Sequence, residues 1–443
     1  MNVITKTVEL PDGRTISWAG GWHDAADLTQ GAGNNNESVI ALLEIAAKTN
    51  DPVLKERALE EARWGLDWLL QTRFGEGWRA SSLIIGIWTK NIRGDKDDMT
   101  AGAERSVESN FRCAETFAMA APFYEDTDPV FARWLREAAI EDFGYAMEDF
   151  LASPNSTKEL NSFAAVSSAR LYSLTGDKKY LDFAADRMST VLDCLQMDPM
   201  ENWKMPLRGF FYEDTSRSRI QGYYHQSQEH RPSQALQILL SSAPEHKDAQ
   251  RWKAACEAVA DYYLATADVI APYGLSPAAV YEVDNTDYSN IYHEGEGVGL
   301  PTMKEYNAQV RNGLNLADSV YLRRFPVAYQ FRGFNGVTLA KAKAMFILSD
   351  IIGSQQLKDI AARQLEWVVG FNPFAASTIY GDGYEYHPLY GAYAGNVVGA
   401  VPVGIETFEN DDEPYWPTQV NATYKEIWTH TTARMLSVCS ELL

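Results

Sequence analysis

The sequence has little positive charge and no long apolar run. It contains 39 Lys and Arg against 60 Asp and Glu, which gives a formal net charge of −21 at pH 7. Binding to nucleic acid requires positive surface that displaces phosphate counterions, so we expect no nucleic-acid partner. No apolar run reaches the length of about 18 residues that a membrane-spanning helix needs, so we expect no membrane partner. The oligomeric state stays open.

Cysteines are few, and the features of a signal peptide are absent. Cys113, Cys194, Cys256 and Cys439 are far apart and lack metal-ligand spacing, so we expect four buried thiols. We expect no metal site and no required cofactor, and nothing in the sequence indicates a structural calcium ion. Residues 1–6 lack an apolar signal core, so we expect either a cytoplasmic protein or the trimmed form of a secreted or periplasmic one.

Apolar and aromatic residues, by contrast, are plentiful. The hydrophobic fraction of 46% is ample for a large core, and there are 12 Trp and 23 Tyr. Flat aromatic rings stack on the C–H faces of sugars while their polar edges stay hydrated, so this surplus is compatible with carbohydrate binding. Packing in the core explains the same rings equally well.

The first residues have a strand pattern rather than a helical one. Residues 3–10 alternate between two faces, a Pro-Asp-Gly turn follows at 11–13, and residues 15–18 continue the pattern. These features predict a β-hairpin within residues 1–19. This hairpin could be the remnant of a separate β-domain, and residues 20–443 would then form the main domain.

Helical spacing of apolar residues dominates the rest of the chain. The predicted helices cover residues 35–48, 52–72, 108–124, 129–152, 157–174, 178–196, 232–243, 246–267, 335–352, 355–369 and 423–441.

Short turns containing Asp, Asn, Gly or Pro alternate with long connections at 73–107, 197–231, 268–334 and 370–422. Helical hairpins with short turns at one end and long loops at the other predict an all-α toroid. Eleven helices are one short of six hairpins, and we expect the missing helix within residues 313–324. The long loops should gather at one face, where function is usually found.

Two aspartates follow a glycine pair at the start of this helical region. Residues 20–27 read GGWHDAAD, which places Asp24 and Asp27 three residues apart. In a helical turn both carboxylates would share one face and could act on one water molecule. Hydrolysis of a glycosidic bond by inversion needs such a base. The alternative is that the aspartates cap the following turn.

A second candidate carboxylate lies near the other end of the chain. Glu426 falls in the first turn of the last predicted helix, after the final long loop. A buried carboxyl group that faces apolar rings keeps its proton more readily, as a general acid requires. The alternative is that an acidic residue is simply favoured there by the helix dipole.

A polar segment precedes the helix predicted at 232–243. It contains His225, Glu229, His230 and Arg231. His230 and Arg231 could recognise sugar hydroxyl or carboxylate groups. The segment could instead be a solvated loop, and its spacing is not specific for a metal.

Several of these stretches together resemble glycoside hydrolase family 9, the family of inverting cellulases and related β-glycosidases. Residues 20–27 are similar to the family's Gly-Gly-Trp-x-Asp-Ala-Gly-Asp segment, and residues 61–70 to its second-helix signature. Residues 369–373, followed by Ser377 and Gly381, resemble its Leu-Gly-x-Asn-Pro…Ser…Gly segment. Glu426 stands at the place of the family's acid-bearing helix.

The resemblance implies an (α/α)6 barrel with a substrate groove across its loop face. Asp27 would be the catalytic base, Asp24 would help to hold the water, and Glu426 would be the general acid. Ala26 replaces a family glycine between the two aspartates, and Lys425 stands where the family has Asn.

The family's Pro-His-His-Arg sugar-binding segment is replaced by YEYHPLY at 384–390. The expected sugar contacts are therefore Trp22, His387, Tyr390, His230 and Arg231.

We therefore expect an inverting glycoside hydrolase that cleaves β-linked glucan-type or related oligo- and polysaccharides. One alternative is a helical-toroid polysaccharide lyase or uronate-specific glycosidase. In that case the main site residues would be Tyr224, His225, His230 and Arg231. Another is a carbohydrate-binding protein without catalysis. The sequence leaves the sugar, the linkage and endo or exo action open.

Overall fold

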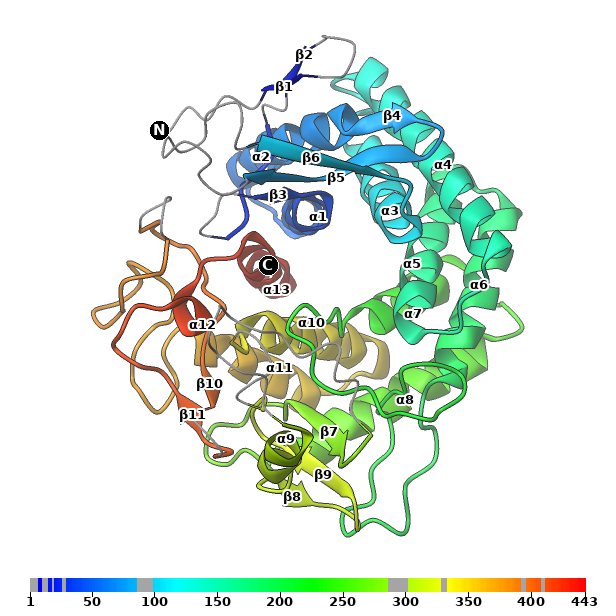
Figure 1. The fold of residues 1–443 in the computed structure, drawn as a ribbon. Helices are drawn as coiled ribbons and strands as arrows, with labels where there is room; N and C mark the ends of the chain where they lie inside the picture. Colours follow the sequence, from blue (N-terminus) through cyan, green and yellow to red (C-terminus); the bar gives the residue numbers. More distant parts are fainter. Residues whose placement is uncertain are drawn as a thin grey trace.

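The structure of the chain is a computed structural model (Figure 1). It describes residues 7–9, 15–17, 20–25, 29–85, 99–285, 302–327, 333–391, 396–407 and 411–443.

Five pairs of consecutive helices and one further helix build the molecule. The pairs are α1 (Ala32–Lys48) with α2 (Pro52–Gln71), α3 (Val107–Tyr124) with α4 (Pro129–Ala152), α5 (Lys158–Thr175) with α6 (Lys178–Asp193), α7 (Arg231–Ser242) with α8 (Ala249–Thr266), and α10 (Asn335–Ile352) with α11 (Gln355–Val368). The further helix is α13 (Thr429–Cys439), which a 3₁₀ turn at Ser440–Leu442 extends.

Six helices form a closed inner ring. Helix α1 packs against α3, and the contacts continue through α5, α7, α10 and α13 back to α1. The partners α2, α4, α6, α8 and α11 lie outside this ring (Figure 1). This arrangement is the predicted (α/α)6 toroid, with α13 pairing with no outer helix in the described part of the chain. The prediction that residues 313–324 hold the missing helix is wrong, because strands β8 (Leu314–Asn315) and β9 (Val320–Arg323) lie there.

Capping residues explain where the outer helices begin. Asp51 and Asp128 accept hydrogen bonds from backbone N–H groups of the first turns of α2 and α4, and a proline opens each helix. Gly176 ends α5 in the left-handed conformation, φ 71°, and Asp177 then caps α6. The short turns predicted from Asp, Gly and Pro are therefore confirmed.

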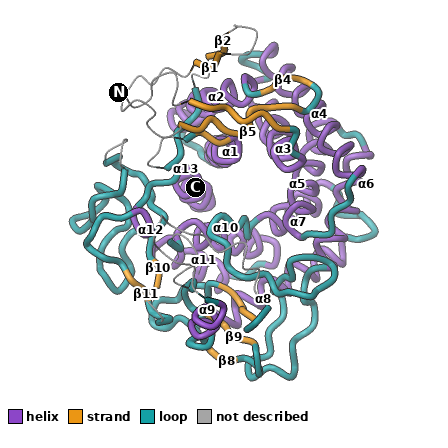
Figure 2. Tube along the Cα trace, in the orientation of Figure 1, coloured by secondary structure: helices purple, strands orange, loops and turns teal. Residues whose placement is uncertain are grey.

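The long connections lie at the end of the barrel where the inner helices begin. Apart from the short link 153–157 between α4 and α5, each short turn joins the end of an inner helix to an outer helix. The long connections therefore lead from outer helices to the N termini of inner helices (Figure 2). The dipoles of the inner helices therefore place their positive ends toward this loop face.

Small sheets occupy parts of these connections. The predicted N-terminal hairpin is present as β1 (Thr7–Glu9) and β2 (Thr15–Ser17), paired antiparallel. Strand β5 (Trp78–Ile85) pairs with β3 (Gln30–Gly31), β4 (Arg73–Gly75) and β6 (Met99–Glu104). Strand β9 pairs with β7 (Ala279–Glu282) and β8, and β10 (Glu406–Thr407) with β11 (Pro414–Tyr415).

Two short helices complete the described chain, α9 (Met303–Val310) and α12 (Ala422–Lys425). Across the described residues, no helix combines the length and apolarity that crossing a membrane would need.

Candidate active site on the loop face

The glycine pair of residues 20–27 allows this segment to lie directly on the barrel. Gly20 and Gly21 have positive φ angles of 118° and 62°. A Cβ atom on Gly21 would stand 2.5 Å from Asn35 Oδ1 on α1 and 3.0 Å from Trp68 Cγ on α2. Only glycine suits both the backbone conformation and this close approach.

Trp22 is anchored to the barrel at both its backbone and its ring. Its N–H donates to Asn35 Oδ1 at 2.9 Å, and its Nε1 donates to Glu61 Oε1 at 2.8 Å. The ring lies against Gly65 on α2, where a Cβ atom would come within 2.5 Å of it. The half-buried indole therefore has packing partners on α2, and its contact with sugar stays a prediction.

Asp24 contacts the helix at the far end of the chain. Its backbone N–H donates to Thr29 O at 2.5 Å, so this stretch forms a β-bridge, and Ala25 after it has φ 52°. Its Oδ1 accepts a hydrogen bond of 2.9 Å from the backbone N–H of Thr429, the first residue of α13. The positive end of α13 therefore stabilises the negative charge of this carboxylate.

Asp27 lies in sequence between the two bridge residues but outside the described residues. Its role as the base stays a prediction. The capping alternative holds for Asp24 in an unexpected form, since this residue caps α13, 405 residues away, rather than the turn that follows it.

Glu426 lies between two helices rather than inside one. The prediction of a single helix over 423–441 is wrong, because α12 ends at Lys425 and the chain is extended at Glu426 (φ −65°, ψ 132°) before α13 begins. The N–H of Val403 donates to Glu426 O at 2.8 Å, and Tyr390 forms a parallel bridge with Glu426. These backbone contacts explain why the helix stops, since the segment pairs with neighbouring loops instead.

The structure brings the two ends of the chain together at this point. Glu426 is buried, and its Oε2 accepts a hydrogen bond of 2.8 Å from Trp428 Nε1. The next residue, Thr429, contacts both Asp24 and the backbone carbonyl of His23. Glu426 lies three residues before Thr429, in the extended segment that leads into α13, and Thr429 contacts Asp24. The acid candidate and the aspartate segment are therefore neighbours, as a closed barrel predicts.

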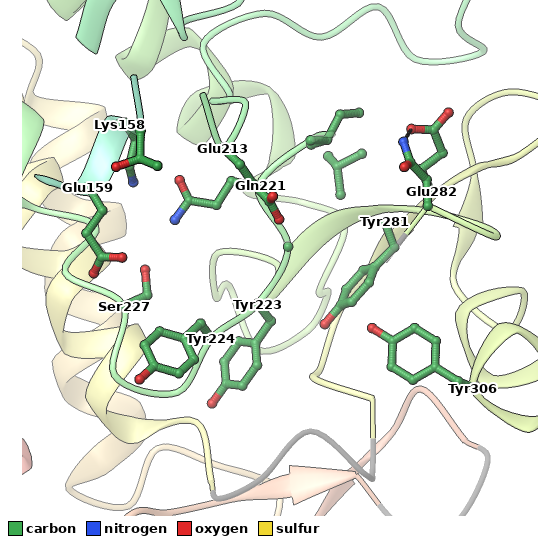
Figure 3. Close-up of a pocket in the computed structure, with 15 residues that line it drawn as sticks. Lys158, Glu159, Glu213, Gln221, Tyr223, Tyr224, Ser227, Tyr281, Glu282 and Tyr306 are labelled. Carbon is green, nitrogen blue, oxygen red and sulfur yellow. Dashed lines mark hydrogen bonds between the residues drawn. The ribbon is translucent and has the colours of Figure 1, made fainter. Parts of the chain in front are cut away.

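A row of aromatic rings leads from Glu426 to a large cavity. The ring of His225 lies 5.2 Å from Trp428, and Tyr224 lies 5.0 Å from His225. Tyr224 lines a cavity of about 370 Å³ on the loop face. Figure 3 shows Lys158 and Glu159 on one side of this cavity and Tyr281 with Tyr306 on the other.

Carboxylates, an amide and phenol groups dominate this cavity. Its labelled polar side chains are Lys158, Glu159, Glu213, Gln221, Tyr223, Tyr224, Ser227, Tyr281, Glu282 and Tyr306 (Figure 3). Glu159 is exposed at the cavity rim, and partial desolvation by the surrounding protein raises its pKa above the usual value, although the Lys158 ammonium opposes this. Such a mixture of hydroxyl, amide and carboxylate groups suits sugar hydroxyls.

His230 and Arg231 lie in the barrel interior. Arg231 is buried, and its guanidinium donates to Glu115 Oε1 on α3 at 2.6 Å and to Gln228 at 2.6 Å. Burial and the Arg231 and Arg434 guanidinium groups keep the pKa of His230 well below its usual value. These positions favour an internal ion-pair network over sugar contact.

His387 and Tyr390 lie beside the Glu426 segment. The Tyr390 N–H donates to Lys425 O at 2.8 Å. The His387 ring is parallel to Trp416 at 5.9 Å, and its Nδ1 lies 3.2 Å from Lys425 Nζ. Burial and the neighbouring Lys425 ammonium lower the pKa of His387, which favours a neutral ring. The structure thus brings these two predicted sugar contacts close to the acid candidate.

The sequence did not single out Trp428, and it did not predict that Lys425 is buried beside Glu426. Lys425 is fully buried, and burial lowers its pKa to about 8. The sequence marked Lys425 only by its position, where the family has Asn. Nothing marked Trp428, because in a continuous helix residues two positions apart do not face each other. Within the described residues, no three His, Cys, Asp or Glu side chains gather as a metal site.

Comparison with family models gives a match over most of the chain. The family model of glycosyl hydrolase family 9 matches residues 3–388. A search among curated proteins finds no match.

Several solved structures share the fold. The endoglucanase J30 of the same family is 16% identical, with a TM-score of 0.66 over 99% of this chain and 78% of its own. The cellulase Cel9M of C. cellulolyticum is 15% identical, with a TM-score of 0.61 over 96% and 88%. An endoglucanase from the termite Nasutitermes takasagoensis is 13% identical, with a TM-score of 0.63 over 99% and 90%. With the family model covering most of its length, this chain belongs to glycosyl hydrolase family 9, the inverting glycoside hydrolases built on an (α/α)6 barrel.

Proposed function

We propose that this protein hydrolyses β-linked glucan chains with inversion, using Asp27 as the base, Asp24 as its partner in holding the water, and Glu426 as the general acid. The observation that carries the proposal is the contact of Asp24 with Thr429, three residues after Glu426. Two carboxylates from opposite ends of the chain share one site at the positive end of α13.

The reaction needs only these groups and water. Asp27 removes a proton from a water molecule, whose oxygen forms a bond to the anomeric carbon. The glycosidic C–O bond breaks, and Glu426 gives its proton to the leaving oxygen. Inversion requires about 6.5–9.5 Å between base and acid, so that a water molecule fits between base and sugar. No step needs a metal or a cofactor, and we propose that none is required.

The substrate class rests on the neighbours and on the cavity beside the site. Cel9M is described in complex with cellobiose, and a further family 9 enzyme, AaCel9A, with a cellobiose-like isofagomine. The cavity lined by Glu159, Tyr224 and Tyr281 supplies polar groups and rings for successive sugar units. Its position next to His225 and Trp428 supports binding of the chain across the loop face.

The test combines a substrate panel with carboxylate variants. Wild-type protein is incubated with β-1,4-, β-1,3- and mixed-linked gluco-oligosaccharides, and reducing ends are measured. We expect turnover of at least one series, and a loss of at least about 100-fold in Asp27→Asn and in Glu426→Gln with retained helical circular dichroism.

Glu137→Gln is the matched control, because Glu137 is an exposed carboxylate on α4 far in sequence from the site. It should keep the wild-type rate. Wild-type rates in Asp27→Asn or Glu426→Gln would remove that residue from the mechanism. Formation of an unsaturated product that absorbs ultraviolet light would show that the protein is a lyase rather than a hydrolase.

A further inference from the structure

The carboxyl group of Glu426 is held by the indole of the residue two positions later. Trp428 Nε1 donates to Glu426 Oε2 at 2.8 Å. Both side chains are buried, with 8% of Trp428 and 6% of Glu426 exposed. Their contact follows from the extended backbone, in which residues i and i+2 point to the same side.

An indole N–H can only donate, and this favours one of the two carboxyl oxygens as the carrier of the acid proton. A protonated carboxyl group carries one O–H and keeps its other oxygen as an acceptor. The carbonyl oxygen of a protonated carboxyl group is its stronger acceptor, so the hydrogen bond from Trp428 Nε1 to Oε2 favours Oε1 as the oxygen that carries the proton.

We propose that Trp428 is a positioning residue that keeps the acid proton of Glu426 on Oε1 and aims this oxygen at the leaving group. The inference rests on the proposed role of Glu426 as general acid. In the reaction, the proton passes from Oε1 to the leaving oxygen as the glycosidic C–O bond breaks. The Trp428 N–H then stabilises the carboxylate that remains, because hydrogen bonds to a charged oxygen are the stronger ones.

The indole is itself held in place from two sides. The ring of His225, from the connection before α7, packs edge-on at 5.2 Å, and the ring of His430 on α13 does so at 5.0 Å. The backbone of the next residue, Thr429, is fixed by Asp24. This packing holds the Trp428 side chain in one rotamer, with its N–H directed at Oε2. The acid is thereby preorganised for the reaction.

Asp27 lies outside the described residues, and the described titratable groups around this pair are His225, His430, Asp24, Lys425 and, in the pocket that Trp428 lines, His23 and Glu61. Burial and the Arg434 guanidinium keep the pKa of His430 well below its usual value, so this ring is neutral at working pH. Trp428→Phe changes none of these charges. It keeps a ring between the two histidines and removes the N–H.

The experiment compares leaving groups, because only a poor leaving group needs the proton. Wild-type and Trp428→Phe proteins are measured on aryl β-glucosides and β-cellobiosides that range from dinitrophenyl to unsubstituted phenyl, and on an oligosaccharide. We expect kcat/KM of the variant to fall about 10-fold to 100-fold on the oligosaccharide and the phenyl glycoside, the effect of one hydrogen bond to a charged group. On the dinitrophenyl glycoside the fall should stay below about threefold, because that group leaves without a proton.

Trp367→Phe is the matched control. Trp367 on α11 is also fully buried, and its Nε1 has no hydrogen-bond partner among the described residues. This change removes an equal volume without touching the acid, so the dependence on leaving group should match wild type even if Tm falls.

A second readout does not depend on turnover. In protein labelled with ¹³C at the glutamate carboxyl groups, the Glu426 signal is identified by its absence in Glu426→Gln. Loss of the N–H removes a donor to the carboxylate, so the titration midpoint of this signal should move to higher pH in Trp428→Phe.

An equal fall on all leaving groups, or an unmoved midpoint, would overturn the positioning role. Absence of wild-type activity on every glycoside would instead count against the proposed function, while the titration would still decide the role of Trp428.

Discussion

At the scale of single residues, the site depends on what each carboxylate contacts. Asp24 has a structural contact and a proposed chemical role at once. Its Oδ1 accepts a hydrogen bond from the Thr429 N–H, and the proposed role of its charge is to hold the attacking water. Arg231 was expected to meet sugar but lies in a buried ion pair with Glu115. Residue type alone did not distinguish the two positions, because the contact of Asp24 with α13 and the burial of Arg231 both depend on the fold.

Two changes at Asp24 should separate its two roles. Asp24→Asn keeps an acceptor oxygen for Thr429 but loses the charge, so kcat should fall about 100-fold with little change in Tm. Asp24→Ala also removes the cap, which should cost about 1 kcal/mol in addition. Steady-state kinetics and thermal unfolding measure the two effects. Equal stability in both variants would argue against the capping contact.

Arg231→Met should reduce stability rather than substrate affinity. Removing one partner of a buried ion pair leaves an uncompensated charge on Glu115, so the free energy of unfolding should fall by about 3–5 kcal/mol. The double change with Glu115→Leu should recover much of this loss. Denaturant unfolding gives the comparison. A stable Arg231→Met protein with a raised KM would restore Arg231 as a sugar contact.

At the scale of elements, local sequence signals predicted the helices well, but they did not predict the extended segment around Glu426 between α12 and α13. Every predicted helix up to residue 369 is present with ends shifted by a few residues, because caps such as Asp51 and Gly176 act locally. The predicted helix over 423–441 was wrong because loops earlier in the chain pair with the backbone around Glu426. Tyr390 and Val403 bind the Glu426 segment there. Such non-local pairing leaves no trace in helical periodicity.

Ion pairs join the inner helices where the ring closes. Glu37 on α1 accepts from Arg112 on α3 and from Arg434 on α13, at 3.0 and 2.9 Å. Burial alone would raise the pKa of Glu37, but the two guanidinium groups together lower it far below its usual value. The closing helix α13 is thus tied to the first helix by charge as well as by packing.

The pH dependence of stability should report this closure. Because the pKa of Glu37 is lowered on folding, its contribution is present above the usual carboxyl value of about 4.3 and is lost as pH falls below it. The stability difference between wild type and Glu37→Gln should therefore be largest near neutral pH and shrink below about pH 4. Urea unfolding across this range is the measurement. A difference that grows on acidification would contradict the pairing.

At the scale of the whole molecule, function follows from closing the ring. Residues 20–27 and Glu426 each had an ordinary structural explanation from sequence alone. Their contact through Thr429 exists because α13 lies beside α1. The toroid and its order of helices were predictable from periodicity and turns, and the family from four short segments. The sugar that the protein binds was not predictable from the sequence, because β7, α9 and the long connections form the cavity walls and their pairing is non-local.

The stereochemistry of the first product tests the central claim most directly. Proton NMR of a β-linked gluco-oligosaccharide, recorded during the first minutes of hydrolysis, distinguishes the anomers before they equilibrate. Attack by water on the face opposite the leaving oxygen predicts that the α-anomer appears first and the β-anomer grows in later by mutarotation. If the β-anomer appears first, the proposed arrangement of Asp24, Asp27 and Glu426 around a single displacement is wrong.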